Sequence, residues 1–253
     1  MMDRFNDKVA LVTGGSSGMG AAAARRLAAE GAAVVIGARR KDLGQDVVDG
    51  IVRDGGRALF VQTDVTVESD VAALVSAAVQ EYGRLDAAFN NAGGGRTFGP
   101  VQSLDTAGWD SDLALNLTSV FYSLKHQVPA LLASGGGSIL NNASNLGVVG
   151  MGTASPYVAA KHGVIGLTRA TALELAQQGV RVNALVSGGV DTPLFRGSMG
   201  ASPEGAAHIA GLHPVNRVAQ PEEIASLVAY LLSDETTFIT GAALTIDGGW
   251  TAQ

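Results

Sequence analysis

The chain of 253 residues contains no cysteine. It can form no disulfide, carry no thiolate nucleophile and bind no metal through sulfur, so nothing in it points to an oxidising compartment. Its first segment, "MMDRFNDKVALVTGG", runs straight into a strand-like stretch without the basic, apolar and small-residue regions of a signal peptide. We therefore expect a cytoplasmic protein.

Charge of either sign is also scarce. Charged residues make up 16% of the chain, the formal net charge is −6, and the densest basic cluster is the short run "ARRK" at 38–41. A nucleic-acid binder normally shows a basic excess, so we expect no nucleic-acid partner. The four histidines show no metal-ligand spacing such as HExxH, so we expect no metal site. No stretch reaches the roughly 18 uninterrupted apolar residues of a membrane span, and we expect no membrane partner.

Apolar residues, by contrast, make up 47% of the chain, which is enough for a large core. Strand-like apolar runs alternate with longer stretches of helical period. The predicted strands span 9–13, 33–37, 58–62, 85–91, 137–144, 180–186 and 243–247. The predicted helices span 18–30, 42–54, 67–82, 105–132, 156–178 and 221–233.

Several of these strands are apolar at consecutive positions, which predicts that both of their faces are covered. The alternation therefore indicates an α/β fold: a doubly wound parallel sheet of seven strands with helices on both faces, in a single domain spanning 1–253. Residues 187–217, rich in Gly, Ala, Ser and Pro, are predicted to form an irregular insert after the sixth strand. Open α/β sheets bind ligands at this edge, so we expect the insert to be a mobile substrate flap.

The stretch "TGGSSGMG" (13–20) joins the first strand to the first helix. Its glycines allow a tight turn, close approach of the backbone to a pyrophosphate and close packing of helix on strand. The helix start adds free N–H groups and the positive end of its dipole. No Lys-Ser/Thr pair follows, which argues against a P-loop and for a Rossmann-like dinucleotide site. The predicted contacts are Gly14, Ser16, Ser17, Gly18, Met19 and Gly20.

The end of the second strand bears on the adenosine ribose. An acidic residue there would bind the ribose hydroxyls of NAD, whereas this chain has Ala38 followed by Arg39 and Arg40. Arginine pairs bidentately with a 2′-phosphate that a carboxylate would repel. We therefore predict NADP(H) as the cofactor, with NAD(H) as the alternative if this is an ordinary basic turn.

Two further strand ends complete the predicted dinucleotide site. Asp64 and Val65 follow the third strand, where the carboxylate either accepts from the adenine amino group or caps the next helix. The run "NNAGGG" ends the fourth strand, and its residues are small enough for the backbone to lie against the cofactor. The predicted contacts in this run are Asn91, Ala92 and Gly93.

The stretch "SPYVAAKHGV" (155–164) places Tyr157 and Lys161 about one helical turn apart, on one face. Either this is an ordinary surface pair, or the ammonium stabilises a phenolate and makes the tyrosine usable as an acid or base near neutral pH. Ser144 stands thirteen residues before the tyrosine, at the end of a predicted central strand. Asn116 lies in an otherwise apolar helix, where an amide taken alone is more often a helix–helix contact.

Together these motifs resemble the short-chain dehydrogenase/reductase family. The resemblance rests on the TGxxxGxG turn, NNAG, the isolated helical Asn, and a Ser followed by YxxxK. It covers essentially the whole chain, through "GVDTP", "PEEIA" and the closing "TGAALTIDGGW". The order and spacing of the motifs favour the catalytic interpretation of Tyr157 and Lys161 over the surface pair.

The resemblance implies a role for each of four residues. Tyr157 would exchange a proton with the carbonyl or hydroxyl oxygen, and Ser144 would hydrogen-bond that oxygen. Bringing a tyrosine pKa from about 10 to near 7 needs about 4 kcal/mol of phenolate stabilisation. Lys161 would supply much of it and hold the nicotinamide ribose, so Tyr157 and Lys161 also count as cofactor contacts. Asn116 would hold a water that connects Lys161 to solvent, and the hydride belongs to the cofactor.

Val190 and Thr192 of "GGVDTP" resemble the residues that anchor the nicotinamide carboxamide. The chain departs from the family pattern at two nearby points. Ser187-Gly188 replaces the usual Pro-Gly after the sixth strand, which removes a preset φ and puts the carboxamide geometry in doubt. Asn216 replaces the Gly of a later Gly-Arg element, a change that we expect to affect only the turn.

The leading hypothesis is an NADP(H)-dependent oxidoreductase, a carbonyl reductase or alcohol dehydrogenase, that interconverts a ketone and a secondary alcohol. A second is a 3-oxoacyl thioester reductase, which would need a basic patch for an acidic carrier protein. Arg96 and Arg196 are the candidates for that patch, but they form no clear cluster. A third is a dinucleotide-sensing protein without chemistry, against which the complete catalytic set argues.

Side chains that flank the catalytic groups or lie in the flap predict a mostly neutral, bulky substrate. These residues are Gly94, Arg96, Asn145, Leu146, Met151, Phe195 and Met199. The last segment, "GAALTIDGGW", is apolar for a chain end, and in the family such tails pack between subunits. We therefore expect a homotetramer.

Overall fold

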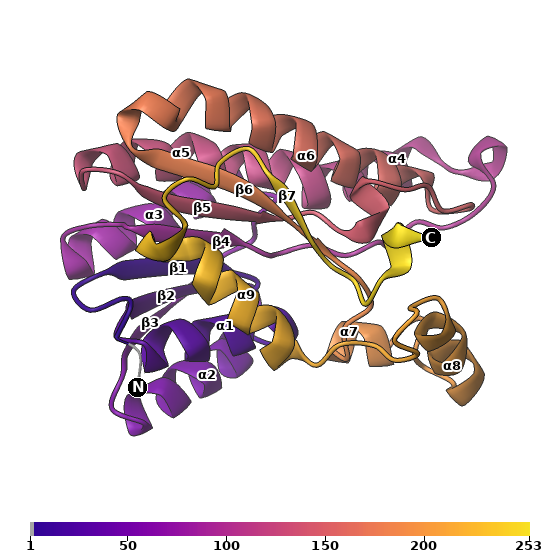
Figure 1. The fold of residues 1–253 in the computed structure, drawn as a ribbon, viewed down its shortest axis with the longest axis horizontal. Helices are drawn as coiled ribbons and strands as arrows, with labels where there is room; N and C mark the ends of the chain where they lie inside the picture. The colour runs from indigo at the N-terminus through magenta and orange to yellow at the C-terminus, as the bar shows by residue number, and fades with distance from the viewer. Residues whose placement is uncertain (1–2) are drawn as a thin grey trace.

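A computed structural model describes residues 3–253 of the chain. Seven strands form one parallel sheet in the order β3-β2-β1-β4-β5-β6-β7, which confirms the predicted fold class (Figure 1). The strands are β1 Val9–Thr13, β2 Ala33–Ala38, β3 Arg57–Gln62, β4 Ala87–Asn90, β5 Gly137–Asn142, β6 Val180–Ser187 and β7 Ala243–Ile246. Across residues 3–253, no helix is long and apolar enough to cross a membrane.

The strand order reverses next to β1. The chain builds β1, β2 and β3 outward in one direction, then returns to place β4 on the other side of β1. Thr13 at the end of β1 is therefore paired with Gly37 on one side and with Asn90 on the other. A parallel sheet opens a crevice at the carboxyl ends of its strands where the order reverses, and ligands bind there.

Helices cover both faces of the sheet. One face carries α1 Gly18–Ala29, α2 Lys41–Arg53 and α9 Pro221–Leu232; the other carries α3 Glu68–Tyr82, α5 Ser119–Ala133 and α6 Ser155–Leu175. The first strand shows why its residues are apolar at consecutive positions. Ala10 and Val12 join the core under α1 and α9, whereas Val9 and Leu11 join the core under α3 and α5, because successive strand side chains point to opposite faces.

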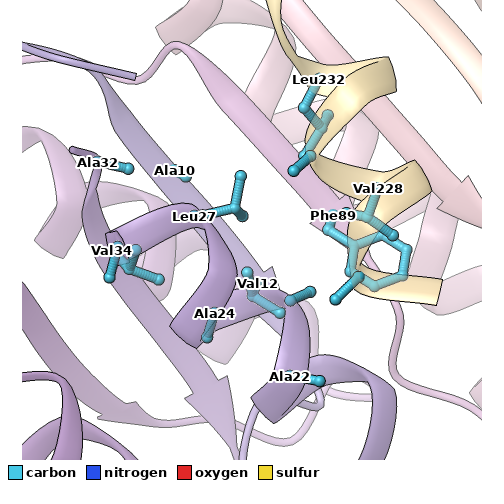
Figure 2. Packing of buried hydrophobic residues seen from close by; sticks show 14 of the residues in the cluster. Ala10, Val12, Ala22, Ala24, Leu27, Ala32, Val34, Phe89, Val228 and Leu232 are labelled. Carbon is cyan, nitrogen blue, oxygen red and sulfur yellow. The ribbon is translucent and has the colours of Figure 1, made fainter. Parts of the chain in front are cut away.

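The packing of α1 against α9 depends on small side chains. Ala22 and Ala24 of α1 lie in the same buried cluster as Val228 and Leu232 of α9, and alanine lets the two helices approach closely (Figure 2). Leu27 fills the space between α1 and the sheet and is fully buried. Truncating such a leucine to alanine costs about 2–5 kcal/mol, so this contact helps to hold α1 and the glycine turn before it against the sheet.

The predicted helix over 105–132 is wrong in one respect, because it is not continuous. The segment consists of α4 Thr106–Leu113, a π-helical turn Ala114–Thr118 and α5. Asn116 lies inside the turn, and its Nδ2 donates to the carbonyl of Asp112 at 3.0 Å. A side chain that bonds the carbonyl four residues back competes with the backbone ladder, and π turns of this kind occur often at functional sites.

The segment predicted as an irregular flap also contains regular structure. After β6 ends at Ser187, two short helices follow, α7 Pro193–Arg196 and α8 Pro203–Gly211, and both project from the carboxyl end of the sheet (Figure 1). Each helix begins with a Ser or Thr N-cap followed by proline, a common helix start. The composition rich in Gly, Ala, Ser and Pro obscured these starts.

Candidate active site

A cleft of about 430 Å³ opens at the carboxyl edge of the sheet, where the strand order reverses. Most of the residues predicted to bind the dinucleotide line it. Those lining residues are Gly14, Ser16, Ser17, Gly18, Met19, Arg39, Arg40, Asp64, Val65, Asn91, Ala92, Gly93, Tyr157, Lys161 and Thr192. Gly20 and Val190 are not among the lining residues: Gly20 lies in the first turn of α1, and Val190 is buried beside the cleft in a bridge with Ala219.

The glycine turn has the shape that a pyrophosphate requires. Gly14 and Gly18 adopt left-handed φ values of 67° and 54°, which glycine reaches without strain. A side chain on Gly20 would lie 2.4 Å from the Gly14 carbonyl oxygen, so only glycine lets α1 start this close to the turn. No acidic residue occupies the first turn of α1, which leaves its N–H groups and positive dipole end for an anion. The turn fits a dinucleotide pyrophosphate.

The two arginines after β2 have different surroundings. Arg40 Nη2 donates to the hydroxyls of Ser17 at 2.5 Å and Ser16 at 3.2 Å, so it ties the glycine turn to the end of β2. Arg39 is exposed at the cleft, and its charge contributes to lowering the pKa of Asp64. Of the two, Arg39 is the one that is not bonded to the glycine turn.

Asp64 does not cap the next helix, because α3 has Val67 as its N-cap residue. Its Oδ1 instead accepts from the Thr66 backbone N–H at 3.0 Å and from the Thr66 hydroxyl at 2.7 Å. Burial opposes ionisation of Asp64, but these bonds, with the charges of Arg39 and Arg96, lower its pKa overall. The carboxylate is therefore ionised at neutral pH at the edge of the cleft.

The chain leaves β4 at Asn91 because its backbone N–H turns to Thr13. The Asn91 N–H donates to the Thr13 hydroxyl at 3.0 Å, and the Ala92 N–H donates to the same oxygen at 3.2 Å. The Asn91 side chain also donates to the carbonyl of Thr13 at 3.1 Å. These bonds end β4 at Asn90 and hold the following residues against the glycine turn, across the point where the strand order reverses.

Asn116 holds the loop that follows this crossing. Its Oδ1 accepts from the Gly94 N–H at 2.8 Å, and its Nδ2 donates to the Gly94 carbonyl at 3.2 Å. A side chain added to Gly93 would lie 2.8 Å from Asn116 Oδ1 and 3.3 Å from Lys161 Nζ, so these two polar groups flank one small opening. The sequence order gave no sign of this pairing between Asn116 and Gly94.

Tyr157 and Lys161 lie on the first two turns of α6 and meet as the sequence predicted. Lys161 Nζ is 5.5 Å from the centre of the Tyr157 ring and donates to the Asn142 backbone carbonyl at 2.7 Å. The lysine is buried, and burial lowers its pKa to about 7. Burial also raises the pKa of Tyr157, against a lowering by its hydrogen bond with Ser144. The protein's own groups therefore favour the protonated phenol, and the expected fall of this pKa toward 7 does not arise from them alone.

Ser144 lies two residues beyond the end of β5, not within the strand over 137–144 that the sequence predicted. It is the N-cap of a short 3₁₀ turn, Asn145–Gly147, and its Oγ accepts from the Leu146 N–H at 3.1 Å. The same hydroxyl donates to Asn145 Oδ1 at 3.0 Å. The turn thus fixes the serine hydroxyl beside the Tyr157 phenol.

The loop after β6 is pinned without the proline that the family pattern has there. Gly189 N–H donates to His213 Nε2 at 2.9 Å, and the His213 Nδ1 lies 2.8 Å from the Ile209 carbonyl. The imidazole is buried and meets the Trp250 ring edge-on, with centroids 5.0 Å apart. His213 therefore takes over the restraint on the segment that carries Thr192. No motif in the sequence predicts this role for His213.

Asn216 supports the expectation that its substitution affects only the turn. Its φ of 55° is left-handed, the region that glycine favours and that asparagine tolerates better than most residues.

His162 is exposed, and its ring nitrogen lies 3.0 Å from the Val158 carbonyl, away from the cleft.

Only two of the predicted substrate residues, Gly94 and Arg96, line the cleft. The others do not: Asn145, Leu146 and Phe195 are buried, Met151 is half-buried, and Met199 is exposed. Several residues that line the cleft were not predicted as contacts: Gly37, Ala38, Thr63, Leu115, Asn142, Pro193 and Leu194. Leu194 follows the Thr-Pro pair on α7, and its side chain leans against Gly94, a contact that only the three-dimensional path of the flap creates.

The fold and the site define a class of protein: a Rossmann-like α/β protein in which Ser144, Tyr157 and Lys161 lie beside a crevice that fits a dinucleotide. A family model described as enoyl-(acyl carrier protein) reductase matches residues 14–251. The chain belongs to the short-chain dehydrogenase/reductase family, as its motifs predicted. This family uses NAD(P), and its alcohol dehydrogenase members support an oxidoreductase acting on CH–OH groups.

Two curated relatives illustrate the similarity over the full length. The chain is 44% identical to a cyclohexanol dehydrogenase of Acinetobacter sp. (strain SE19), covering 100% of this chain and 98% of the relative. It is 46% identical to a cis-4-hydroxycyclohexanecarboxylate dehydrogenase of Sinomonas cyclohexanicum, covering 100% of both. Among solved structures, levodione reductase superposes with a TM-score of 0.94 at 36% identity, covering 98% of this chain and 99% of that one. An actinorhodin polyketide ketoreductase variant with NADPH gives 0.92 at 36% identity, covering 100% of both.

Proposed function

We propose that this protein is an NADP(H)-dependent oxidoreductase that interconverts a secondary alcohol and a ketone, with Tyr157 as the general acid and base. The observation that carries the proposal is the meeting of Ser144, Tyr157 and Lys161 beside a crevice that fits a dinucleotide. When bound, the nicotinamide supplies or accepts the hydride. The protein's own residues would orient the substrate oxygen and handle its proton.

In the reducing direction, Tyr157 would give its proton to the carbonyl oxygen. A buried phenol that stays protonated at neutral pH suits this acid role. The Ser144 hydroxyl would turn from Asn145 to the same oxygen and stabilise the developing alkoxide. Lys161, with a pKa of about 7, would exchange protons readily at physiological pH and so return a proton to Tyr157. Asn116, whose Oδ1 shares an opening with Lys161 Nζ, would hold the relaying water.

The preference for NADP(H) rests on Arg39. Its guanidinium is exposed at the adenosine end of the cleft, while Arg40 is already engaged by Ser16 and Ser17. The buried Ala38 at the end of β2 offers no carboxylate to repel a 2′-phosphate. A structural neighbour at 36% identity is recorded with NADPH.

The substrate is proposed to be a six-membered alicyclic ring bearing the alcohol or ketone. Relatives at 44% and 46% identity are named for cyclohexanol and cis-4-hydroxycyclohexanecarboxylate. The apolar side chains near the reacting phenol agree with such a ring. Phe98 and Tyr157 both approach Gly95, and Leu194 packs on Gly94. Phe98 and Leu194 keep more than half of their surface exposed, which leaves the entrance open to a compact ring.

A thioester substrate is the second candidate, because the matching family model is described by an acyl carrier protein reductase. That function calls for free basic residues around the entrance. Arg196, one of the two candidates, pairs bidentately with Asp191 at 2.6 and 2.7 Å, which leaves Arg96 by itself. The ring substrate is therefore preferred.

The test is absorbance at 340 nm with NADPH and NADH in parallel, against cyclohexanone, a substituted cyclohexanedione and an acetoacetyl thioester. We expect NADPH-dependent reduction of the ring ketones that Tyr157→Phe abolishes. Preference for NADH would refute the role of Arg39 and leave the chemistry standing. Turnover of the thioester alone would replace the ring substrate with the second candidate.

The protein is proposed to assemble as a homotetramer. Phe238 is fully exposed and Leu173 is 84% exposed, and the segments that carry them meet where Gly241 lies beside Ala172. Large apolar side chains that are exposed close together are typical of an interface between subunits. Light scattering tests the assembly, and a monomeric mass would refute it.

A further inference from the structure

One polar side chain of the cleft has a function left unassigned. Asn142 is the last residue of β5, is 8% exposed and lines the cleft. Its side-chain oxygen, Oδ1, is buried without a hydrogen-bond partner among residues 3–253. A buried acceptor left unpaired costs about 1–3 kcal/mol, so such a group is normally paired with a bound molecule.

The neighbours of Asn142 fix which end of its amide is unpaired. Asn91 uses its Nδ2 to donate to the carbonyls of Thr13 at 3.1 Å and Gly14 at 3.4 Å, so only its oxygen is left to face Asn142. Asn142 must therefore present its own Nδ2 to Asn91 Oδ1, at 3.3 Å. A flipped amide would set two oxygens against each other, so the unpaired group is an acceptor.

The position of Asn142 in the sheet selects the half of the cofactor that it faces. The strand order reverses between β1 and β4, and a dinucleotide lies across that point. The glycine turn and Arg39 belong to the adenosine side, whereas β5 lies on the opposite side, with Lys161 Nζ bonded to the Asn142 carbonyl. Asn142 thus faces the nicotinamide half. The hydrogen-bond donors of the nicotinamide half are the ribose hydroxyls and the carboxamide. The carboxamide is expected at Thr192, on the loop after β6.

We propose that Asn142 Oδ1 accepts a hydrogen bond from a hydroxyl of the nicotinamide ribose and so fixes that ribose beside Lys161. This inference rests on the proposed dinucleotide function and adds a residue to it. Asn142 becomes a positioning residue: it orients the sugar that carries the hydride-transferring ring, and its amide in turn is oriented by Asn91.

The competing explanation is a trapped water that serves Asn142 alone. Asn145 offers a matched control, because it is 4% exposed, also carries one unpaired amide atom, and does not line the cleft. Asn142→Leu and Asn145→Leu each remove a buried amide at nearly constant volume. Asn142→Ala removes the same acceptor if the leucine variant does not fold.

The experiment is isothermal titration of wild type and both leucine variants with three ligands that share an adenosine end. These are adenosine 2′,5′-bisphosphate, 2′-phospho-ADP-ribose and NADP⁺; ADP, ADP-ribose and NAD⁺ form a parallel series without the 2′-phosphate. Loss of one neutral hydrogen bond predicts roughly 3- to 10-fold weaker binding of every ligand that contains the second ribose, in Asn142→Leu only. Binding of the adenosine fragments stays unchanged in all variants.

Each other result contradicts a different statement. Unchanged affinities in Asn142→Leu would overturn the inference and favour the trapped water. Weaker binding of the dinucleotide without weaker binding of the ADP-ribose form would overturn the ribose contact and point to the carboxamide. Equal weakening in Asn145→Leu would show a general disturbance of the site. Failure of wild type to bind either dinucleotide would refute the proposed function itself, and the inference with it.

Discussion

Replacing Lys161 by methionine is expected to stabilise the protein while it destroys activity. Lys161 is 2% exposed, and burial lowers its pKa from 10.5 to about 7. A difference of one pKa unit corresponds to about 1.4 kcal/mol, so keeping this lysine buried costs about 5 kcal/mol once it is charged. Methionine fills a similar volume without charge, but it leaves the Asn142 carbonyl without its donor, at a cost of about 1–3 kcal/mol. The net gain where the lysine is fully charged, below pH 6, is about 2–4 kcal/mol.

The gain depends on pH with a definite sign. The folded-state pKa of Lys161 is depressed, so the wild-type protein is least penalised above pH 10.5 and loses stability as the pH falls toward 7. The stability difference between Lys161→Met and wild type should therefore shrink by about 1.4 kcal/mol per pH unit between pH 7.5 and 9.5. Below pH 6 the difference should be constant.

The assay is urea unfolding of both proteins at pH 6, 7, 8 and 9, with Lys41→Met as the matched control. Lys41 is exposed at the start of α2, so its replacement should change stability little at any of these pH values. A Lys161→Met protein less stable than wild type at pH 7 would refute the reasoning. A stability difference that does not change with pH would also refute it, because it would mean that burial does not depress the pKa of Lys161.

Three further predictions follow from single contacts. Gly20→Ala places a methyl 2.4 Å from the Gly14 carbonyl oxygen, so it should destabilise the fold by about 1–3 kcal/mol in urea unfolding and weaken dinucleotide binding by more than tenfold in titration. His213→Phe keeps a ring against Trp250 but leaves the Gly189 N–H unpaired, so it should cost about 1–3 kcal/mol in the same unfolding assay, and a stability equal to wild type would contradict the restraint on this loop. Arg39→Ala should weaken NADP⁺ binding by about tenfold or more and leave NAD⁺ binding nearly unchanged, and an equal effect on both would show that Arg39 does not read the 2′-phosphate.

The sheet was predictable because strands that are buried on both faces are apolar at consecutive positions in the sequence. A strand such as "VALVT" has no polar face, and this pattern marked its position before any packing was known. The ends of the strands depended on contacts from elsewhere. Asn91 leaves the sheet because its N–H finds the Thr13 hydroxyl, 78 residues earlier. The bonds that join Asn116 to Gly94, 22 residues before it, likewise appear in no local pattern.

The side chains of the site also divide into those that local spacing predicts and those that depend on distant contacts. Tyr157 and Lys161 meet because helical spacing alone puts them on one face. Arg39 and Arg40, in contrast, are adjacent and chemically identical, and only the position of Ser17 decides that Arg40 is engaged with the turn while Arg39 stays at the cleft. Leu194 could not be predicted either, because α7 brings it over Gly94 from a segment about 100 residues away.

The dipeptide Asn-Asn occurs twice at the site, as Asn90-Asn91 and Asn141-Asn142. In each case the first asparagine is part of a buried network and the second lines the cleft. Asn90 and Asn141 stand opposite each other in β4 and β5, and their amides join a buried network with Gln127 and Thr168 at 2.8 to 3.0 Å. Successive strand side chains alternate in direction, so the second asparagine of each pair is available at the cleft. Asn91 and Asn142 bond each other there.

The buried network gives the surface pair its rigidity. Every amide in it is paired, and a fully paired polar network fixes its members in one arrangement, so β4 and β5 cannot slip past each other without breaking several bonds. The cleft amides inherit that register and would meet the proposed cofactor already oriented, which would reduce the entropy lost on binding. Sequence alone could not assign these roles, because the four asparagines differ only in which direction the strand turns them.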